Sequence, residues 1–454
     1  MAETMPAQDS AKLDVEALKL SFTERRAKIG VIGLGYVGLP LVKALNAGGY
    51  PVTGFDIDRE KIAHLKAGES YIRMISSATV RDMVDSGRFH ATADFTETAA
   101  MDAILICVPT PLDHNREPDL SYVEHTAEAI APHLRAGQLI VLESTTYPGT
   151  TAELLRPILE RGGLESGRDF FLAYSPERED PGNPKFDTSR IPKVIGGDGP
   201  AAVELAVALY GQIVTQVVPV SSLATAEAVK LTENIFRAVN IALVNELKVI
   251  YEKMDIDIWE VIDAAKTKPF GFMPFYPGPG LGGHCIPIDP FYLTWKARQY
   301  DVGTRFIELA GEIKTAMPLH VMQRLGEELG ERTGKTLNGA RVLVVGAAYK
   351  KNVDDIRESP ALRILGLLRD RGAAVDYYDP YIPEIKMTRE HADLSGMRSI
   401  EWSAENLKIY DAALICTDHD GVDYEALVEN CALVVDSRNA TKHIEAHRER
   451  IVKV

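Results

Sequence analysis

Residues 33–38 read Gly-Leu-Gly-Tyr-Val-Gly, the pattern G-x-G-x-x-G, and they follow directly on the apolar run 28–32. A helix-forming stretch comes next, and a second apolar run then ends in Asp56, 18 residues after Gly38. A glycine-rich turn between a strand and a helix, with an acid at the end of the next strand, is typical of a dinucleotide-binding βαβ unit. The motif therefore predicts an open α/β sheet with a nucleotide at its edge.

Each glycine of the motif has a physical role in such a unit. Gly33 allows the tight turn, Gly35 lets the backbone approach a pyrophosphate, and Gly38 permits close packing of helix on strand. An acid at Asp56 suits the ribose hydroxyls of NAD and repels the 2′-phosphate of NADP, although Arg59 nearby is compatible with NADP. The sequence predicts a NAD site formed by Gly33, Gly35, Tyr36, Val37, Gly38 and Asp56.

Strand-like segments alternate with helix-like segments in two blocks of the chain. Apolar runs bounded by turn residues lie at 28–33, 52–56, 102–108, 138–143, 170–174 and 214–220, and again at 342–346, 374–379, 412–417 and 432–436. Between the blocks, residues 224–254 contain neither Gly nor Pro and carry an apolar stripe at helical spacing. A further helical stretch runs through 317–332, and residues 270–290, dense in Gly, Pro and aromatics, read as an ordered loop.

These patterns predict an α/β fold of two Rossmann-like, doubly wound domains joined by a long central helix and a helical middle domain. The expected parts are an N-terminal extension at 1–27, with a peripheral helix within 13–26, and a NAD-binding domain at 28–220. A central domain with the cysteine loop is expected at 221–332, and the second Rossmann-like domain at 338–454. The long helix also offers a surface for a homodimer.

The composition excludes several classes of protein. A formal net charge of −15 argues against non-specific binding of nucleic acid, which needs a positive field. No stretch approaches about 20 consecutive apolar residues, so no membrane helix is expected, and residues 1–27 lack the apolar core of a secretory signal. Four scattered cysteines make neither a disulfide framework nor a zinc site, so we expect no metal and a cytoplasmic location.

One cysteine stands apart from the other three. Cys285 lies in a loop after two glycines, where an exposed thiol can come close to a ligand, and a thiolate beside NAD can add to an aldehyde. The others lie in apolar, strand-like runs, where a buried inert thiol is expected: Cys107, Cys416 and Cys431. On these grounds alone, a loop cysteine without a role remains the simpler interpretation of Cys285.

Lys230 and Asn234 are four residues apart on the predicted central helix, and therefore lie on one face of it. A lysine on the inward side of such a helix needs an anionic partner. The spacing leaves a solvated lysine open as the alternative.

The order and spacing of these residues resemble the UDP-glucose/GDP-mannose dehydrogenase superfamily, from Lys28 to about Asn439. The matching motifs are Gly33–Gly38, Cys107-Val-Pro-Thr110-Pro, Ser144-Thr145, Ser175-Pro-Glu177, Lys230-x3-Asn234, Gly282-Gly-His-Cys285-x3-Asp289 and Ala348-Tyr-Lys350-x-Asn352-x-Asp354-Asp355-x-Arg357. The resemblance implies a four-electron oxidation of the C6 hydroxymethyl of a nucleotide sugar to a carboxylate, with NAD as the acceptor.

The resemblance also implies roles for single residues. Cys285 would attack the aldehyde and carry the thiohemiacetal and then the thioester, while Lys230 and Asn234 would stabilise the developing oxyanion. Asp289, Glu177 and Thr145 would position water and manage protons. Thr110 and Thr145 would also contact NAD, and Gly282, Glu177, Lys230 and Asn234 the substrate.

The second β/α block lacks G-x-G-x-x-G after its first strand, since residues 346–350 read Gly-Ala-Ala-Tyr-Lys. It is therefore a poor second NAD site. In the family this domain binds the nucleotide diphosphate, and Lys350, Arg357 and Arg438 are the basic residues available for charge-assisted hydrogen bonds to it.

The sequence departs from the UDP-glucose enzymes in two places. Those enzymes often carry a second acid four residues after the Glu of Ser-Pro-Glu, where this chain has Pro181, and no role is assigned to Glu179 or Asp180. The loop 267–280 also differs. Both segments resemble the branch that acts on UDP-N-acetylhexosamines, with UDP-N-acetylglucosamine as the first choice for the substrate and UDP-N-acetylmannosamine, UDP-N-acetylgalactosamine and UDP-glucose as alternatives.

Two other functions remain as rivals. A two-electron dehydrogenase of the hydroxyacid type would share the first domain but would have no use for Cys285 or the C-terminal block. A catalytically silent nucleotide-sugar-binding protein would leave Cys285, Lys230 and Asp289 without a reason to occur together.

Overall fold

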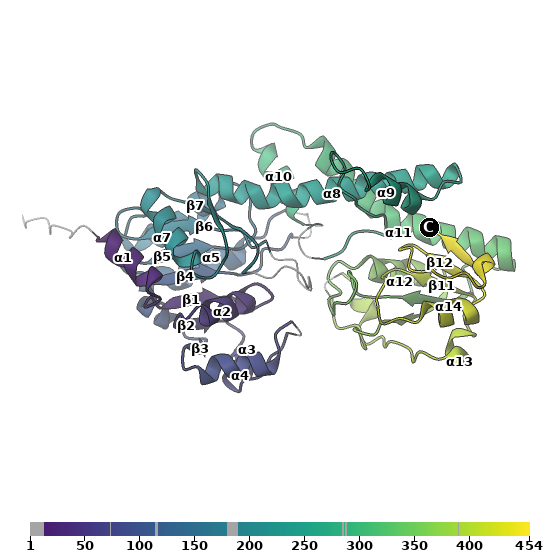
Figure 1. The fold of residues 1–454 in the computed structure, drawn as a ribbon, viewed down its shortest axis with the longest axis horizontal. Coiled ribbons are helices and arrows are strands. Elements are labelled where there is room, and N and C mark those ends of the chain that lie inside the picture. Colours follow the sequence, from purple (N-terminus) through teal and green to yellow (C-terminus); the bar gives the residue numbers. More distant parts are fainter. Residues whose placement is uncertain are drawn as a thin grey trace, which may run out of the picture. The chain divides into compact units, whose positions relative to one another are not determined.

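The structure is a computed structural model that describes residues 13–72, 74–113, 117–178, 189–283, 286, 288–388 and 390–454. The chain divides between residues 232 and 233 into two compact units (Figure 1). The predicted peripheral helix is α1 (Val15–Thr23). No helix within the described ranges is long and apolar enough to cross a membrane.

The first unit contains an eight-stranded sheet of order β3-β2-β1-β4-β5-β6-β7-β8. In β1 the register places Ile29 beside Val52 of β2 and Ala103 of β4. The pairs are parallel except β6 with β7. The strands are β1 (Ile29–Ile32), β2 (Val52–Phe55), β3 (Phe89–Thr92), β4 (Ala103–Ile106), β5 (Leu139–Leu142), β6 (Phe171–Tyr174), β7 (Lys193–Gly197) and β8 (Val217–Pro219).

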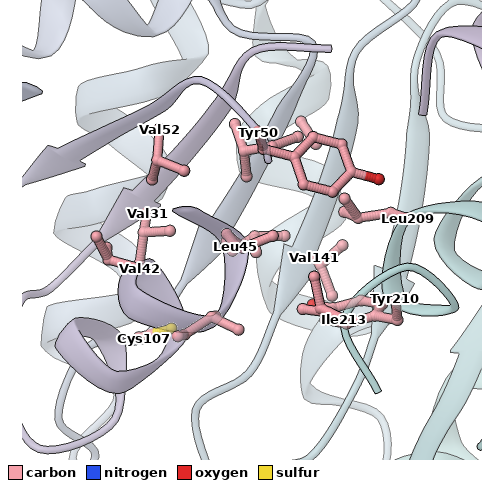
Figure 2. Packing of buried hydrophobic residues seen from close by; sticks show 14 of the residues in the cluster. Val31, Val42, Leu45, Tyr50, Val52, Cys107, Val141, Leu209, Tyr210 and Ile213 are labelled. Atoms are coloured by element: carbon pink, nitrogen blue, oxygen red, sulfur yellow. The ribbon is translucent and has the colours of Figure 1, made fainter. Parts of the chain in front are cut away.

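Both faces of this sheet are buried because successive side chains of a strand point to opposite sides. Val31 and Leu105 belong to one apolar core, while Ile32 and Ile106 belong to the other. Figure 2 shows part of the first core. That core is covered by α1, α2 (Gly38–Ala47), α3 (Arg59–Lys66), α4 (Ser77–Asp85) and α7 (Pro200–Tyr210), and the other by α5 (Ser121–Ile130) and α6 (Arg156–Leu159).

The second unit combines helices with a five-stranded parallel sheet of order β10-β9-β11-β12-β13. Helix α8 (Leu223–Lys253) begins in the first unit and ends in this one. Further helices are α9 (Ile258–Ala265), α10 (Asp289–Arg298), α11 (Arg305–Thr333), α12 (Pro360–Asp370), α13 (Ala404–Leu407) and α14 (Tyr424–Asn430). The strands are β9 (Arg341–Val345), β10 (Ala374–Tyr378), β11 (Ala412–Ile415), β12 (Val434–Asp436) and β13 (Ile451–Lys453).

The second sheet is also buried on both faces. Val342 and Val344 of β9 pack with residues of α11 and α12, and Leu343 and Val345 pack with residues of α13 and α14. The predicted α/β class with Rossmann-type sheets and a helical middle part is confirmed. The four-part division of the chain stays a prediction.

Several details differ from the sequence prediction. The strands β3, β7 and β13 were not predicted, and β7 runs antiparallel to β6, so the first sheet is not parallel throughout. The helix expected from Met317 begins at Arg305 and contains Pro318. The loss of one backbone hydrogen bond at this proline is offset by burial, since Met317, Pro318 and Val321 are all buried.

Candidate functional site

The motif 33–38 lies at the switch point of the first sheet, where β2 and β4 flank β1 on opposite sides. Gly33 has a φ of +90°, and a Cβ there would lie 2.7 Å from the carbonyl oxygen of Cys107, just after β4. A Cβ at Gly38 would lie 1.9 Å from the carbonyl oxygen of Gly33. The fold itself therefore requires glycine at both positions.

Gly35 differs from these two glycines because a Cβ built there would meet no atom within 4 Å. Tyr36 and Val37 are half-buried beside it, just before α2 begins at Gly38, and Thr110 is buried just after β4. The backbone N–H groups of a helix N-terminus favour an anion. Open space over Gly35 at the start of α2 fits the pyrophosphate of NAD.

Asp56 follows β2 and fixes the shape of this loop. Its Oδ2 accepts a hydrogen bond from the backbone N–H of Leu34 at 2.9 Å, and its Oδ1 accepts one from that of Asp58 at 2.9 Å. Lys61 of α3 lies 3.4 Å from Oδ2. A carboxylate in this position can also accept hydrogen bonds from ribose hydroxyls, which fits NAD.

Glu177 lies after β6, at the same carboxyl edge of the first sheet. Its Oε2 accepts a hydrogen bond from Lys193 Nζ at 3.0 Å, and its Oε1 accepts one from the backbone N–H of Arg178 at 2.7 Å. Its backbone carbonyl accepts one from Lys230 Nζ at 2.5 Å. Thr145 is half-buried directly after Ser144, at the end of β5. The structure thus brings Glu177 and Lys230 together.

Asn234 lies one turn beyond Lys230 on α8, and its described contacts are in the second unit. Its Nδ2 donates to Oδ2 of Asp289, the buried first residue of α10. Its Oδ1 accepts from the guanidinium of Arg237. The two predicted residues Asn234 and Asp289 are therefore in direct contact, and Arg237, which the sequence did not single out, holds the amide oxygen.

Cys285 lies outside the described residues, as do Glu179, Asp180 and Pro181. The two glycines before the cysteine are described. A Cβ at Gly282 would lie 2.6 Å from Tyr349 Cβ, and the backbone N–H of Gly283 donates to the carbonyl of Arg357 at 3.0 Å. The chain therefore reaches the cysteine in close contact with the loop that follows β9.

That loop is the counterpart of the motif 33–38, and it is built differently. Gly346 has a φ of +87° and packs against Thr417, after β11, much as Gly33 packs against Cys107. Asp379, after β10, accepts hydrogen bonds from the backbone N–H groups of Ala347 and Ala348. It also accepts from Tyr381 N, Ile382 N and His419 Nε2.

His419 is fully buried in this arrangement. Its Nδ1 accepts a hydrogen bond from the backbone N–H of Asn352 at 2.9 Å, so its Nε2 carries the proton that Asp379 accepts. Burial alone would raise the pKa of Asp379, but His419 and the backbone donors lower it. Asp379 stands where the acid that binds a ribose stands in a dinucleotide site, but it already accepts hydrogen bonds from groups of the protein itself.

A cavity of about 620 Å³ opens at the carboxyl edge of the second sheet. Aromatic side chains line it beside basic and acidic ones: Trp259, Tyr276, Tyr424, Lys266, Lys351, Arg438, Lys442, Asp263, Asp418 and Asp420. Arg438 Nε lies 3.3 Å from Asp418, and Lys351 Nζ lies 2.7 Å from Asp420. Aromatic faces suit a base, and the basic groups suit a diphosphate.

The three basic residues predicted for the diphosphate are placed differently. Arg438 lines the cavity. Lys350 is half-buried in the loop after β9, and Arg357 is exposed and paired with Asp355 at 2.6 Å. The structure therefore places only Arg438 of the three at the cavity wall.

The sequence reasoning missed Lys193 and Glu143. Lys193 begins β7, a strand that was not predicted, and its Nζ lies 2.5 Å from Oε2 of the fully buried Glu143. Two features of the sequence could have indicated them. Lys193 is a charged residue at the start of the otherwise apolar run 193–197, and Glu143 is an acid directly after the buried strand β5. Buried charges of this kind are retained only when they are paired.

Three segments of the chain match models of one family. They are described as the NAD binding domain, the central domain and the UDP binding domain of the UDP-glucose/GDP-mannose dehydrogenase family, over residues 27–214, 224–315 and 343–443.

Two named relatives match most of the chain. It is 37% identical over 357 residues to the UDP-N-acetyl-D-glucosamine 6-dehydrogenase of Pseudomonas aeruginosa, across 78% of this chain and 83% of that protein. It is 34% identical over 421 residues to a UDP-N-acetyl-D-mannosamine dehydrogenase of Pyrococcus horikoshii, across 91% and 96%. A solved structure of UDP-D-ManNAc dehydrogenase from the same organism aligns with a TM-score of 0.84 and 32% identity, across 94% and 98%.

Proposed function

Because this chain belongs to the UDP-glucose/GDP-mannose dehydrogenase family and is an NAD-dependent UDP-sugar dehydrogenase, we propose that it oxidises C6 of UDP-N-acetylglucosamine to the uronic acid. The overall reaction is RCH2OH + 2 NAD⁺ + H2O → RCOO⁻ + 2 NADH + 3 H⁺. When bound, NAD would supply the hydride acceptor for both oxidations of C6.

The first unit supports the binding of NAD. Gly33 and Gly38 form the turn, the space over Gly35 admits the pyrophosphate, and Asp56 is placed for the ribose hydroxyls. Tyr36 and Val37 follow Gly35 directly, Thr110 follows β4, and Thr145 follows the neighbouring strand β5.

The covalent steps fall to Cys285. Its sulfur forms a bond to the C6 aldehyde carbon while the oxygen takes a proton, which gives a thiohemiacetal. Loss of a hydride and a proton gives the thioester. Attack of water then breaks the carbon–sulfur bond and releases the carboxylate and the thiol.

Five polar residues that the family motifs single out assist these steps. Lys230 carries a positive charge that stabilises the developing oxyanion, and Asn234 donates to that oxygen when its amide exchanges Asp289 for substrate. Glu177 and Asp289, with Thr145, position the water and take up its protons.

The second unit supports the binding of the nucleotide. The cavity combines Tyr276 and Tyr424 with Arg438, so a base and a diphosphate both find partners there. Lys350 and Arg357 belong to the loop against which Gly282 and Gly283 pack. This loop therefore lies beside the two glycines that precede Cys285 in the sequence.

The choice of sugar rests on one observation, the likeness over most of its length to the Pseudomonas aeruginosa enzyme named for UDP-N-acetyl-D-glucosamine. The resemblance of residues 175–183 and 267–280 to the hexosamine branch points the same way. UDP-N-acetylmannosamine is the second candidate, because a relative with that name matches 91% of the chain.

Counting NADH per sugar tests the proposal. Limiting UDP-N-acetylglucosamine, UDP-N-acetylmannosamine, UDP-N-acetylgalactosamine and UDP-glucose are each incubated with excess NAD⁺. We expect two NADH per UDP-N-acetylglucosamine, with the highest kcat/KM for that sugar. One NADH per sugar, or a preference for UDP-glucose, would overturn it. Cys285→Ser should bind both ligands but release no acid, with Cys416→Ser as the matched control.

We further propose that the enzyme is cytoplasmic and at least a homodimer through α8. Phe236, Leu243 and Ile250 are spaced by seven residues, and 48%, 50% and 45% of their surfaces are exposed. Such spacing forms a continuous stripe on a helix. Light scattering should give a dimer or a larger assembly that Leu243→Glu dissociates. A monomeric wild-type protein would contradict this.

A further inference from the structure

Four polar side chains form a hydrogen-bonded chain that runs from the core of the first unit to Glu177. The Tyr210 hydroxyl donates to Oε1 of Glu143. Lys193 Nζ donates to Oε2 of Glu143 at 2.5 Å and to Oε2 of Glu177 at 3.0 Å. The inner end is sealed, since Tyr210 lies in the apolar core beside Val141 (Figure 2).

The outer end of the chain is the one that solvent can reach. The Glu143 side chain is 0% exposed and that of Lys193 is 4% exposed, whereas the Glu177 side chain keeps 13% of its surface accessible. Its other oxygen is fixed by the backbone N–H of Arg178. The carboxylate of Glu177 is thus held in one orientation at the carboxyl edge of the sheet.

Burial and charge determine which groups are ionised. Burial alone would lower the pKa of Lys193, but the carboxylates of Glu143 and Glu177 raise it, so the ammonium persists. Burial raises the pKa of Glu143, and Lys193 opposes that rise. Burial and the charge of Glu143 raise the pKa of Tyr210, which therefore remains a hydrogen-bond donor. One ammonium is thus shared by two acids.

Charged and titratable groups face Glu177 from each element around it. Lys193 comes from β7, Glu143 from the end of β5 and Lys230 from α8. Cys107, after β4, is buried, and burial raises its pKa well above the ordinary value, so it stays a neutral thiol. The Arg178 guanidinium donates to the carbonyl of Pro192 at 2.7 Å.

A purely structural ion pair would need only Lys193 and Glu143. That pair already satisfies the buried ammonium of β7 and the buried carboxylate at the end of β5, on either side of β6. The additional bond from Lys193 to Glu177 connects this pair to a residue at the sheet edge that also receives Lys230 and is proposed to bind NAD. The arrangement is therefore suited to control the charge of Glu177.

We propose that Lys193 is the positioning residue for Glu177, and that Glu143 sets the strength of its effect by competing for the same ammonium. This inference rests on the proposed function, in which Glu177 positions water and takes up a proton. Lys193 keeps the carboxylate ionised and oriented. Glu143 draws part of the positive charge away, which leaves Glu177 basic enough to accept a proton.

The test is the pH dependence of kcat for two variants with opposite expected effects. In Lys193→Met, Glu177 loses its cation, so the acid limb of the profile moves to higher pH by about one unit. In Glu143→Gln, the ammonium belongs to Glu177 alone, so the acid limb moves to lower pH by a similar amount. Lys193→Arg, which keeps the charge, should restore most of the wild-type profile.

Folding is checked separately by NAD⁺ titration and by thermal unfolding. If Lys193→Met does not fold, Glu143→Gln and Tyr210→Phe carry the test, because both retain the Lys193–Glu177 pair. Tyr210→Phe leaves Glu143 more dependent on Lys193, so its acid limb moves slightly upward. A loss of kcat without any displacement of the profile means a structural role only and overturns the proposal.

Failure of the proposed function gives a different result. Wild-type protein that reduces no NAD⁺ with any UDP-sugar would overturn the proposed function and this inference together. Wild-type protein that releases two NADH per sugar, with variants whose profiles coincide with its own, would overturn this inference alone.

Discussion

The two sheets of this protein begin in the same way and then diverge within a few residues. In each, the first strand is followed by a glycine with positive φ, Gly33 or Gly346, which packs against Cys107 or Thr417 just after the next strand in the sheet. In each, the second strand is followed by a buried aspartate, Asp56 or Asp379. Each sheet therefore has a crevice at its switch point, beyond the carboxyl ends of its strands.

The loops decide what each crevice can hold. In the first sheet, Gly35 leaves open space and Asp56 binds two backbone N–H groups and Lys61. In the second, two alanines follow the glycine, and Asp379 accepts four backbone N–H groups and the imidazole of His419. A carboxylate whose lone pairs are all used internally cannot also bind a ribose.

The largest effect is expected from Asp379→Asn. The substitution removes a buried negative charge that faces four N–H groups and His419, so we expect a loss of about 3–4 kcal/mol in the free energy of unfolding. The matched variant Asp56→Asn should cost less stability and weaken NAD⁺ binding about tenfold. Urea unfolding and NAD⁺ titration of both variants measure this. Equal losses of stability in the two variants would remove the distinction between the sheets.

Acid should destabilise the second unit before the first. Burial alone would raise the pKa of Glu252, but His320, Lys248 and Arg324 lower it from 4.5 to about 2. Because the folded pKa is depressed, its stabilisation is present above pH 4.5 and is lost as the pH falls from 4.5 toward 2. It amounts to about 2–3 kcal/mol.

Two buried carboxyl groups of the first unit respond to acid in the opposite sense. Burial raises the pKa values of Glu143 and Glu227, so protonation of these two groups costs the folded state less than it costs the unfolded chain. Hydrogen exchange at pH 5, 4 and 3 should therefore show α11 and the end of α8 opening first, and Glu252→Gln should weaken that pH dependence. Earlier opening of β1, β4 and β5 would contradict the prediction.

A smaller effect is expected from Gly35→Ala. A Cβ there meets no protein atom, so stability should be unchanged, but the methyl group occupies the space of the pyrophosphate. We expect NAD⁺ affinity to fall by about tenfold or less, equivalent to about 1 kcal/mol. Gly366→Ala in α12 also meets no atom and serves as the control that leaves NAD⁺ affinity unchanged, while alanine within the helix raises stability by about 1 kcal/mol. Unchanged NAD⁺ affinity in Gly35→Ala would place the cofactor elsewhere.

Local patterns allowed much of the fold to be predicted from sequence. Several features can be recognised from a few consecutive residues: the motif 33–38, the acid at Asp56 and the apolar runs of β1, β4, β5 and β6. The strands can be recognised in this way because a strand buried on both faces is apolar throughout. The long helix α8 could be predicted from its apolar stripe at helical spacing and from the absence of Gly and Pro.

Features that depend on contacts between residues far apart in the sequence could not be predicted. β7 begins with a charged residue, and only the partner Glu143, 50 residues away in sequence, explains why that residue is buried. The first turns of α11 mix exposed apolar residues with polar ones, contain Gly311 and precede a proline, and they are helical where Gly311 packs against Phe291 of α10. His419 and Asp379 are 40 residues apart, and neither shows a local sign of the buried pair.

The assignment of NAD to the first sheet and of the nucleotide to the second is tested most directly by hydrogen exchange with one ligand at a time. NAD⁺ alone should protect residues 33–38 and the segment after β4, and leave 418–420 and 436–443 unchanged. UDP alone should protect 418–420 and 436–443 and leave 33–38 unchanged. Protection of the second set by NAD⁺, or of residues 33–38 by UDP, would contradict the assignment of cofactor and nucleotide to separate sheets.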